Sequence, residues 1–290
     1  MSQTLCLAQP ASTQGWKGSL HLDYRLSESG QTTLKHHHTG PMRVFKSLYP
    51  QGPRICQTVL IHPPGGLVGG DVLNITAELK PGAHALISTP GATRFYASDQ
   101  HMAAQQVQFR LHAGSRLEWC PLETLAYPGC KAHNHLSVQL DPGAEMIGWD
   151  VTSLGLPASD KAFDQGIYTQ TIEIEPSWLE QARIDAHDRL LMNGSLGLNG
   201  YRALGTCWFA CGSVMPTARI EQLTDACRSA LPQPNTNLLL GVTAPNPQVV
   251  VVRALSHQTE PILQAFQAIW RQLRPCAWGL EAEPPRIWQV

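Results

Sequence analysis

Three copies of one turn pattern decide the fold of this chain: Leu79-Lys-Pro-Gly-Ala-His-Ala-Leu86, Leu111-His-Ala-Gly-Ser-Arg-Leu-Glu118 and Leu140-Asp-Pro-Gly-Ala-Glu-Met-Ile147. In each copy an alternating segment ends in Leu, a Pro/Ala-Gly-small turn bends the chain, and a second apolar segment follows. The copies recur at near-equal intervals, which is typical of repeats that bury their apolar faces on one another. The pattern favours a mainly β, β-helix-like stack of strands, while an antiparallel sandwich with similar hairpins stays open.

The segments around these turns have the period of strands with one buried face. Apolar and polar residues alternate over 20–26, 73–79, 107–111 and 136–140. Alternation of this kind predicts half-buried strands. We therefore expect a β body over residues 16–215.

The last third of the chain changes to helical spacing. Apolar residues recur three and four apart over 217–230 and over 259–273, with Pro275 just after the second run. The valines of 249–252 predict a buried strand between these helices. We expect a small α/β section with two helices over 216–290, a single domain over 16–290, and a flexible N-terminus over 1–15.

The composition excludes several classes of protein. Of the 290 residues 43% are hydrophobic and 15% charged, so the chain is no disordered protein. A net charge of −1 gives no basic field for nucleic acid or for an anionic membrane. The chain has no apolar run long enough for a membrane span, and its N-terminus has no signal-peptide pattern. We expect a cytoplasmic protein whose eight cysteines are reduced thiols.

The stretch His62-Pro-Pro-Gly-Gly-Leu-Val-Gly-Gly-Asp71 has four glycines and two prolines in ten residues. It lacks the Gly-Lys-Ser/Thr ending of a phosphate loop and precedes a strand. We interpret it as a tight structural corner with Asp71 capping a turn, or with Asp71 as a binding or metal-path residue. The loop Thr89-Pro-Gly-Ala-Thr-Arg-Phe-Tyr96 is similar, and its hydroxyls and Arg94 either bind an anion or satisfy turn backbone.

Carboxylates beside aromatic residues form a second group of candidates. Glu118 and Glu123 flank an apolar strand, and Asp150 follows Trp149 in the next repeat. They either hold a divalent cation, or act as a general acid/base pair, or lie on a solvated face.

Two histidine groups have the residue types of metal ligands. His133 and His135 share a face if they lie on a strand, and Cys130 precedes them; a closed zinc site is not expected without a second ligand pair. His36, His37 and His38 are expected in an exposed loop. Cys207 and Cys211 are expected to pack as small apolar side chains.

Taken together, the motifs resemble the UreD (UreH) family of urease accessory proteins over roughly residues 16–290. The matching stretches, in chain order, are Gly40-Pro-Met-Arg-Val44, Tyr49-Pro50, His62 to Asp71, Thr89 to Tyr96, Leu117-Glu-Trp119, Glu123-Thr124, Ile269-Trp270, Leu273-Arg-Pro275 and Pro285-Arg-Ile-Trp288. The chain departs from the family at 154–163, at Cys120-Pro-Leu-Glu123 and at Cys56-Gln57.

The resemblance implies a nickel-delivery scaffold without turnover of its own. Such a protein binds apo-urease and a UreF-type partner, which holds a UreG-type GTPase, and nickel passes through an internal tunnel. It implies no tightly bound cofactor, only a nickel ion in transit, within a hetero-oligomer whose stoichiometry, dimeric or otherwise, stays open. Because a weakly charged surface suits a protein held between partners, we expect the isolated chain to be poorly soluble.

On the same resemblance, two sets of residues become candidates. The tunnel candidates are Asp71, Thr93, Asp150 and Asp188, and the structural motif is His62, Pro63, Pro64, Gly65, Gly66, Gly69, Gly70 and Gly91. Trp270, Arg286 and Trp288 either dock the UreF-type partner or close the core. Competing hypotheses are a stand-alone β-solenoid hydrolase or lyase that uses Glu118, Glu123 and Asp150, and a structural adaptor without metal passage.

Overall fold

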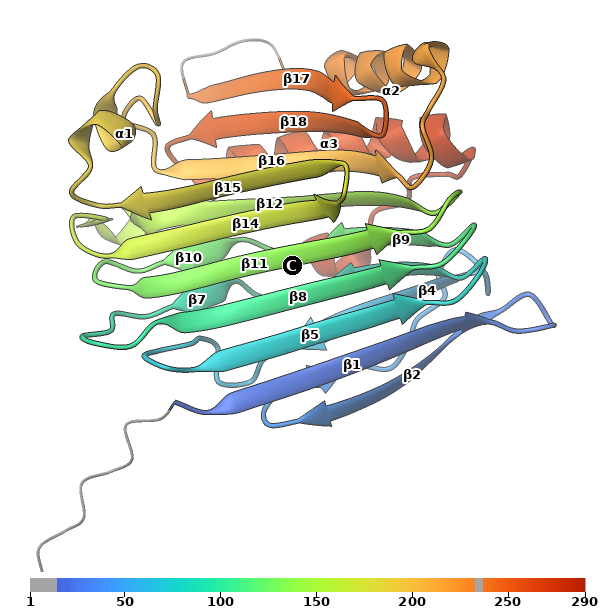
Figure 1. Cartoon of the computed structure of the whole chain (residues 1–290), viewed down its shortest axis with the longest axis horizontal. Helices are drawn as coiled ribbons and strands as arrows, with labels where there is room; N and C mark the ends of the chain where they lie inside the picture. The colour runs from blue at the N-terminus through green and yellow to red at the C-terminus, as the bar shows by residue number, and fades with distance from the viewer. Residues whose placement is uncertain (1–14, 233–236, 290) are drawn as a thin grey trace, which may run out of the picture.

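The computed structural model describes residues 15–232 and 237–289 and has a β-solenoid arrangement of about four turns. The expected flexible N-terminus lies, except for Gly15, outside the described residues. One sheet lies in front of a second sheet in the view of Figure 1, and the chain passes from one sheet to the other at each turn of the solenoid.

The first sheet has seven strands in the order β15-β14-β11-β8-β5-β1-β2. Its five central strands, β1, β5, β8, β11 and β14, run parallel, which excludes the sandwich alternative for the body, and β2 and β15 pair antiparallel at the two edges. The strands are β1 (Lys17–Leu26), β2 (Thr32–Thr39), β5 (Val72–Leu79), β8 (Ala103–Leu111), β11 (Lys131–Leu140), β14 (Ile167–Glu175) and β15 (Trp178–Asp185).

The second sheet has eleven strands, with its main path in the order β17-β18-β16-β12-β9-β6-β4-β3. The strands β4, β6, β9 and β12 run parallel, and β16, β18 and β17 extend the sheet antiparallel. Its strands are β3 (Arg43–Val44), β4 (Ile55–Ile61), β6 (His84–Ser88), β7 (Thr93–Phe95), β9 (Arg116–Cys120), β10 (Thr124–Ala126), β12 (Glu145–Leu156), β13 (Lys161–Ala162), β16 (Ala203–Cys211), β17 (Leu238–Asn246) and β18 (Val249–Ser256).

The repeated turns are the corners of the solenoid. Gly82, Gly114 and Gly143 occupy equivalent corner positions with φ of 71°, 68° and 79°. This left-handed conformation is open to glycine without steric cost, which explains the shared Gly of the three sequence copies. The amides of His112 and Asp141 each donate to the carbonyl of the corresponding Leu one turn below, so the corners stack as the strands do.

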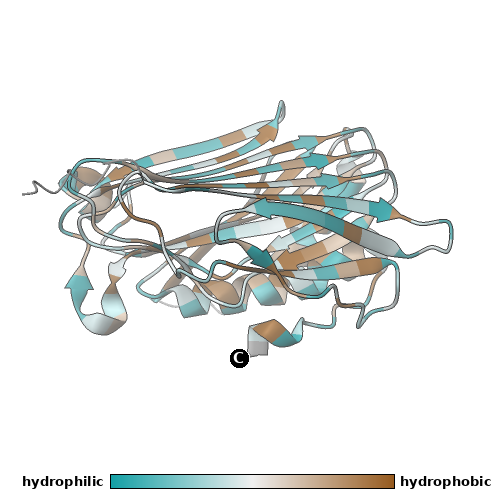
Figure 2. Cartoon of the chain, turned by 90° about the horizontal axis from the view of Figure 1, so that it is seen from below, coloured by the Kyte–Doolittle hydropathy of each residue, from teal (hydrophilic) through white to brown (hydrophobic). Residues whose placement is uncertain are grey.

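Two hydrophobic cores result from this arrangement. One lies between the sheets and receives the alternating residues of β1, β5, β8 and β11. The other lies between the outer face of the eleven-stranded sheet and the helices α2 (Thr217–Ser229) and α3 (Thr259–Trp278). The helices lie outside one of the two sheet layers, and apolar and polar residues alternate along many strands (Figure 2). Cys207 and Cys211 pack in the second core, as predicted.

Two expectations about local structure were wrong. α3 does not end before Pro275 but continues to Trp278, where Gly279 ends it in the left-handed conformation. His36, His37 and His38 do not form a loop, because they pair with β1 as part of the edge strand β2. The two helices expected in the C-terminal section are present, and a short further helix, α1 (Arg189–Asn193), lies before that section and has too few residues to show a period.

The remaining elements are two 3-10 turns, η1 (Pro157–Ser159) and η2 (Arg286–Gln289). η1 and β13 fold the divergent 154–163 loop back onto the end of β12, where Gly155 pairs with Ala162. Within residues 15–232 and 237–289, none of the helices combines the length and the hydropathy that a membrane crossing demands.

Candidate functional site

A cavity of about 130 Å³ lies between the two sheets, below the two glycine-rich loops. Its mouth is formed by His62, Gly65 and residues 89–94, and its walls by both sheets. The apolar wall residues are Met42, Leu60, Leu73, Ile75, Val107, Trp119 and Leu136, and the polar ones include Gln105, Thr124, Asn134 and Asp150.

The loops at the mouth are successive turns of the solenoid. The amide of Leu67 donates to the carbonyl of Arg94 at 2.7 Å, and Arg94 Nη1 donates to the carbonyl of Gly65 at 3.2 Å. A Cβ on Gly66 would come within 2.4 Å of the ring of Tyr96. The motif glycines therefore allow the 62–71 loop to lie against the 89–96 loop, which supports the structural-corner interpretation.

Asp150 is the only carboxylate among the described residues that line this cavity, and it is 8% exposed. It accepts hydrogen bonds from Asn134 Nδ2 at 2.9 Å, Gln170 Nε2 at 2.6 Å and Thr152 Oγ1 at 3.3 Å. All three donors are neutral. Burial raises the pKa of Asp150 to about 6, although the hydrogen bonds oppose this shift. Among the described residues no cation forms an ion pair with Asp150, although Arg94 also lines the cavity. A divalent cation could neutralise this carboxylate.

Thr93 and His62 join Asp150 at this cavity, but Asp71 does not. The carboxylate of Asp71 accepts from the backbone N–H of Trp16 at 3.1 Å and from that of Val68 at 2.9 Å. Asp71 is 4% exposed, and it closes the glycine-rich loop onto the start of β1. The turn-capping interpretation of Asp71 fits these contacts, and Asp71 does not line the cavity that contains Asp150.

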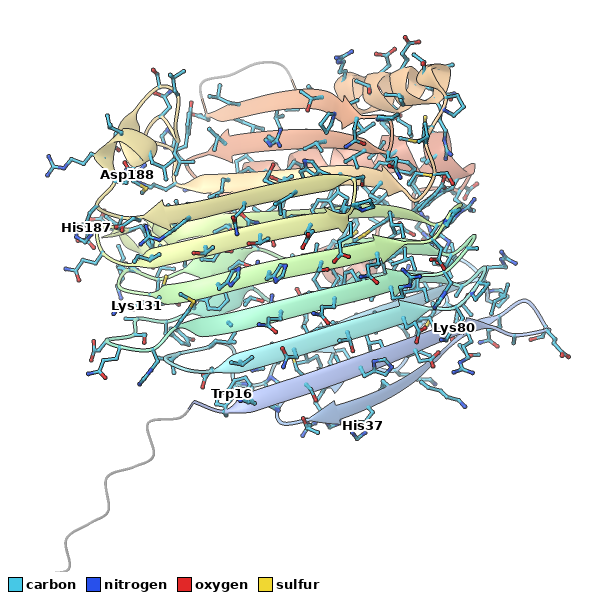
Figure 3. The ribbon with its side chains drawn as sticks, viewed as in Figure 1. Trp16, His37, Lys80, Lys131, His187 and Asp188 are labelled. Carbon is cyan, nitrogen blue, oxygen red and sulfur yellow. The ribbon has the colours of Figure 1, made fainter. Side chains whose placement is uncertain are left out.

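Asp188 is not among the residues that line the cavity. It lies directly before α1, which projects beside the ends of the strands (Figure 3). It is exposed, and its carboxylate caps α1 by accepting from the N–H of Leu191 at 3.0 Å. The remaining motif residues divide by position. Gly65 and Gly91 line the mouth of the cavity, Pro63 and Pro64 are exposed, and Gly69 and Gly70 continue the loop toward Asp71.

Glu118 lies on the other face of the sheet from Asp150. In the register of β9 and β12, Glu118 pairs with Ile147, so the side chain of Asp150 points to the opposite side. Glu118 therefore faces the helices and cannot form an acid/base pair with Asp150. Glu123 lies in the loop after β9, is partly exposed, and does not line the cavity. The pairing of Glu118 with Asp150, one of those considered for a hydrolase or lyase, is therefore not formed.

Glu118 is completely buried in a charged cluster that sequence analysis missed. His84 Nε2 lies 2.8 Å away, Trp270 Nε1 donates at 2.6 Å, and Arg274 Nε lies at 3.2 Å. Burial alone would raise the pKa of Glu118, but the His84 contact and the Arg274 charge outweigh burial and lower it. Glu118 is therefore an ionised anchor for α3.

A second anchor of the same kind lies one solenoid turn further. Glu145 accepts from Trp278 Nε1 at 2.7 Å and lies 2.7 Å from Arg219 Nη2. Trp270 and Trp278 of α3 thus each donate an indole N–H to a buried carboxylate, Trp270 to one on β9 and Trp278 to one on β12. The pairing explains why α3 extends beyond Pro275, and residues this far apart in sequence offered no signal for it.

The three C-terminal candidates, Trp270, Arg286 and Trp288, differ in burial. Trp270 is fully buried, and the ring of Trp288 packs on those of Trp149 and Trp270 with centroids 5.2 and 5.1 Å apart. Trp288 Nε1 also donates to Ser88 Oγ at 3.2 Å. These tryptophans close the second core, and Arg286 is exposed at the surface beside them.

The histidine candidates do not form a closed metal site with Cys130. His133 and His135 share the outer face of β11, as predicted, with stacked rings 5.6 Å apart. Cys130 is buried in the opposite, inner core, so it does not join them. No group of three or more His, Cys, Asp or Glu side chains in the described part of the chain is arranged to hold a metal ion.

Sequence analysis missed three interior amides: Gln105 and Asn134 line the cavity, and Gln170 donates to Asp150. Gln105 Nε2 donates to Asn134 Oδ1 at 3.2 Å, which fixes the Asn134 amide that donates to Asp150. The available signal was their strand position, because Asn134 occupies an inward position between Ala132 and Leu136.

Comparisons with known proteins give a consistent result over the whole domain. Residues 17–289 match the family model described as UreD urease accessory protein. A urease accessory protein UreD of Paracidovorax citrulli is 50% identical over 275 residues, covering 95% of this chain and 99% of the relative. Proteins of the same name from Albidiferax ferrireducens and Variovorax paradoxus are 48% and 45% identical, with the same coverage to within one percentage point.

Proposed function

Because the chain belongs to the UreD family of urease accessory proteins, we propose that it acts in urease maturation as a scaffold without turnover of its own. In this proposal it binds apo-urease on one side and a UreF-type partner, holding a UreG-type GTPase, on the other. Nickel is cargo that passes through the interior of the solenoid. The setting we expect for this assembly is the cytoplasm.

The observation that carries the proposal of nickel passage is the cavity at Asp150. An ion in transit needs sites that attract it but do not retain it. Asp150 supplies one negative charge, Thr93, Asn134 and Gln105 supply neutral oxygens, and His62 supplies one ring nitrogen at the mouth. A cage of thiolates and several imidazoles would hold a borderline ion much more strongly.

Exposed apolar side chains support the proposal that partners cover this chain. Leu190 is 83% exposed and Leu196 fully exposed on the α1 projection, and Val214 is 69% exposed near α2. Leu190 and Leu196 lie close together in the sequence on one projection, and contiguous exposed apolar surface is typical of interaction sites. Arg286 supplies an exposed cation beside the buried Trp288, and we propose it as a contact for the UreF-type partner.

The proposal of nickel passage is tested by urease activation in cells that carry the other urease genes. The variant is Asp150→Ala, and the control is Glu173→Gln, which removes a carboxylate from the outer face of β14. Urease from the Asp150→Ala cells should contain little nickel while the abundance of the accessory complex stays normal. Full nickel loading at normal complex abundance would contradict the proposal.

Docking is tested separately by pull-down of the UreF-type partner. Truncation after Pro275 would remove Trp278 and Trp288 from the second core, so loss of binding could reflect unfolding. Arg286→Glu changes only an exposed charge. We expect weaker partner capture with an unchanged melting temperature, and unchanged capture would exclude Arg286 from the interface.

A further inference from the structure

A second cavity lies on the outer face of the eleven-stranded sheet, outside the solenoid interior. Its volume is about 490 Å³, within the range of small-molecule sites. β4 and β6 form its base, the 48–51 loop forms one wall, and the C-terminal segment 283–287 forms another. Its lining is mainly apolar and includes Leu48, Tyr49, Val59, Leu86, Pro285 and Ile287.

The walls of this cavity are held together by the chain itself. Gln51 Nε2 donates to the carbonyl of Glu283 at 2.8 Å, and Arg274 Nη2 donates to Gln51 Oε1 at 2.6 Å. Arg274 also donates to the carbonyl of Glu281. The buried Arg274 therefore fixes both the 48–51 loop and the C-terminal segment, so the cavity exists without a partner protein.

One polar side chain on the base of the cavity is unsatisfied. Gln57 lies on β4, is 7% exposed, and lines the cavity. Its Nε2 is buried and has no hydrogen-bond partner. Buried donors are normally paired, and leaving one unpaired costs free energy. A ligand with a hydrogen-bond acceptor would remove this cost if it placed the acceptor beside Gln57.

The charge at the cavity indicates what kind of acceptor would bind. Arg286 is the one cation among the described residues that line this cavity, and the exposed Glu283 of the same segment also lines it. An amide donor and a guanidinium in one apolar cavity match a carboxylate attached to an apolar body. Because the chain's own C-terminal segment already forms one wall, the remaining volume of about 490 Å³ fits a small molecule.

We propose that this cavity is a binding site for a small amphipathic carboxylate with an aliphatic or aromatic body. The apolar body contacts Val59, Leu86 and Ile287, and the carboxylate accepts from Gln57 and Arg286. This site is separate from the cavity at Asp150, and the inference does not depend on nickel passage.

The test is calorimetric titration of the full-length chain with octanoate and with benzoate, and octanol serves as the uncharged probe. We expect saturable binding of at least one carboxylate and weaker binding of octanol. Gln57→Leu should weaken carboxylate binding about tenfold, which corresponds to one hydrogen bond to a charged group. The matched control Gln108→Leu, on an exposed position of β8, should bind like the unaltered chain.

Two further variants keep the proposal falsifiable. Val59→Trp should fill the cavity and abolish binding of every probe, and if it fails to fold, Arg286→Gln should still weaken octanoate binding and leave octanol binding unchanged. The proposal is wrong if no probe binds saturably at millimolar concentration. It is also wrong if octanol binds as tightly as octanoate and Gln57→Leu changes neither, since binding would then be adventitious apolar contact.

Discussion

The two faces of the sheet at β9 and β12 surround buried carboxylates in different ways. On the helix side, Glu118 and Glu145 each contact an arginine and an indole N–H, so their charges are neutralised within the chain. On the interior side, Asp150 has only amide and hydroxyl donors and faces a cavity. The difference indicates that the helix-side carboxylates stabilise the fold, while Asp150 is kept at a cost to stability, as is common for functional groups.

The largest expected effect is on the helix side. Glu118→Gln keeps an acceptor for the Trp270 N–H but leaves the Arg274 charge unpaired in the core. Breaking a buried ion pair in this way costs about 3–5 kcal/mol of unfolding free energy. Urea denaturation measures this loss.

The control for that prediction removes both charges. Glu118→Gln combined with Arg274→Met should recover a large part of the lost stability, because no unpaired charge then remains. If Glu118→Gln alone changes the unfolding free energy by less than ~1 kcal/mol, Glu118 does not anchor α3, and the proposed difference between the helix-side carboxylates and Asp150 is wrong.

The next effect concerns the turn cap. Asp71→Ala leaves the backbone N–H groups of Trp16 and Val68 without their acceptor. We expect a loss of about 2–3 kcal/mol, measured by denaturation, since hydrogen bonds to charged groups exceed neutral ones in strength. Any loss of nickel loading in this variant should then follow the loss of folded protein. Reduced loading at full stability would return Asp71 to the nickel path.

Unlike Glu118→Gln and Asp71→Ala, which lower the free energy of unfolding, Asp150→Asn should raise it. Burial raises the pKa of Asp150 from its ordinary value of 3.8 to about 6 in the folded chain, so the folded chain binds the proton more tightly than the unfolded chain. Ionisation therefore reduces stability as pH rises from about 4 through 6, and two pKa units correspond to at most about 3 kcal/mol. We expect the variant to be more stable than the unaltered chain at pH 7, by about 1–3 kcal/mol.

The pH dependence provides the check on this prediction. The stability difference between Asp150→Asn and the unaltered chain should disappear below about pH 4, where both side chains are neutral. Melting curves between pH 4 and pH 8 measure it. A variant that is less stable at pH 7 would mean that the three hydrogen bonds outweigh the burial of charge.

The smallest effect is expected at Asp188. Asp188→Ala removes the cap of the short helix α1 and should cost about 1 kcal/mol or less. Because Asp188 is exposed and lies outside the cavity, nickel loading of urease should be unchanged. Loss of loading without loss of stability would place a second carboxylate in the nickel path.

The sequence predicted the parts of this structure that depend on local pattern. The corner glycines, the alternation over 73–79 and 107–111, and the Trp270 helix all follow from periods and turn chemistry within a few residues. The near-equal spacing of the corners also predicted the β-helix-like stack, while the parallel pairing of its strands came from the structure. These signals are local, because each repeat must bury its own apolar face against the next.

The candidate site was harder to predict, because the role of each carboxylate depends on which face of its strand the side chain occupies. Glu118 and Asp150 look alike in sequence, each next to a tryptophan, but the register of β9 and β12 places them on opposite faces. Arg274, which neutralises Glu118, comes from a helix in the last part of the chain. The motif around Asp71 predicted either a turn cap or a residue on the nickel path. In the structure the Asp71 carboxylate caps the turn by accepting from two backbone N–H groups.

The central claim is that Asp150 serves nickel passage rather than folding, and transfer in vitro tests it most directly. A purified complex with its nickel-loaded GTPase partner is mixed with apo-urease, and the nickel content of the re-isolated urease is measured for the unaltered chain, Asp150→Asn and Glu173→Gln. We predict that Asp150→Asn, although at least as stable at pH 7, transfers nickel much more slowly, while Glu173→Gln transfers it normally. Equal transfer by all three complexes would contradict the account.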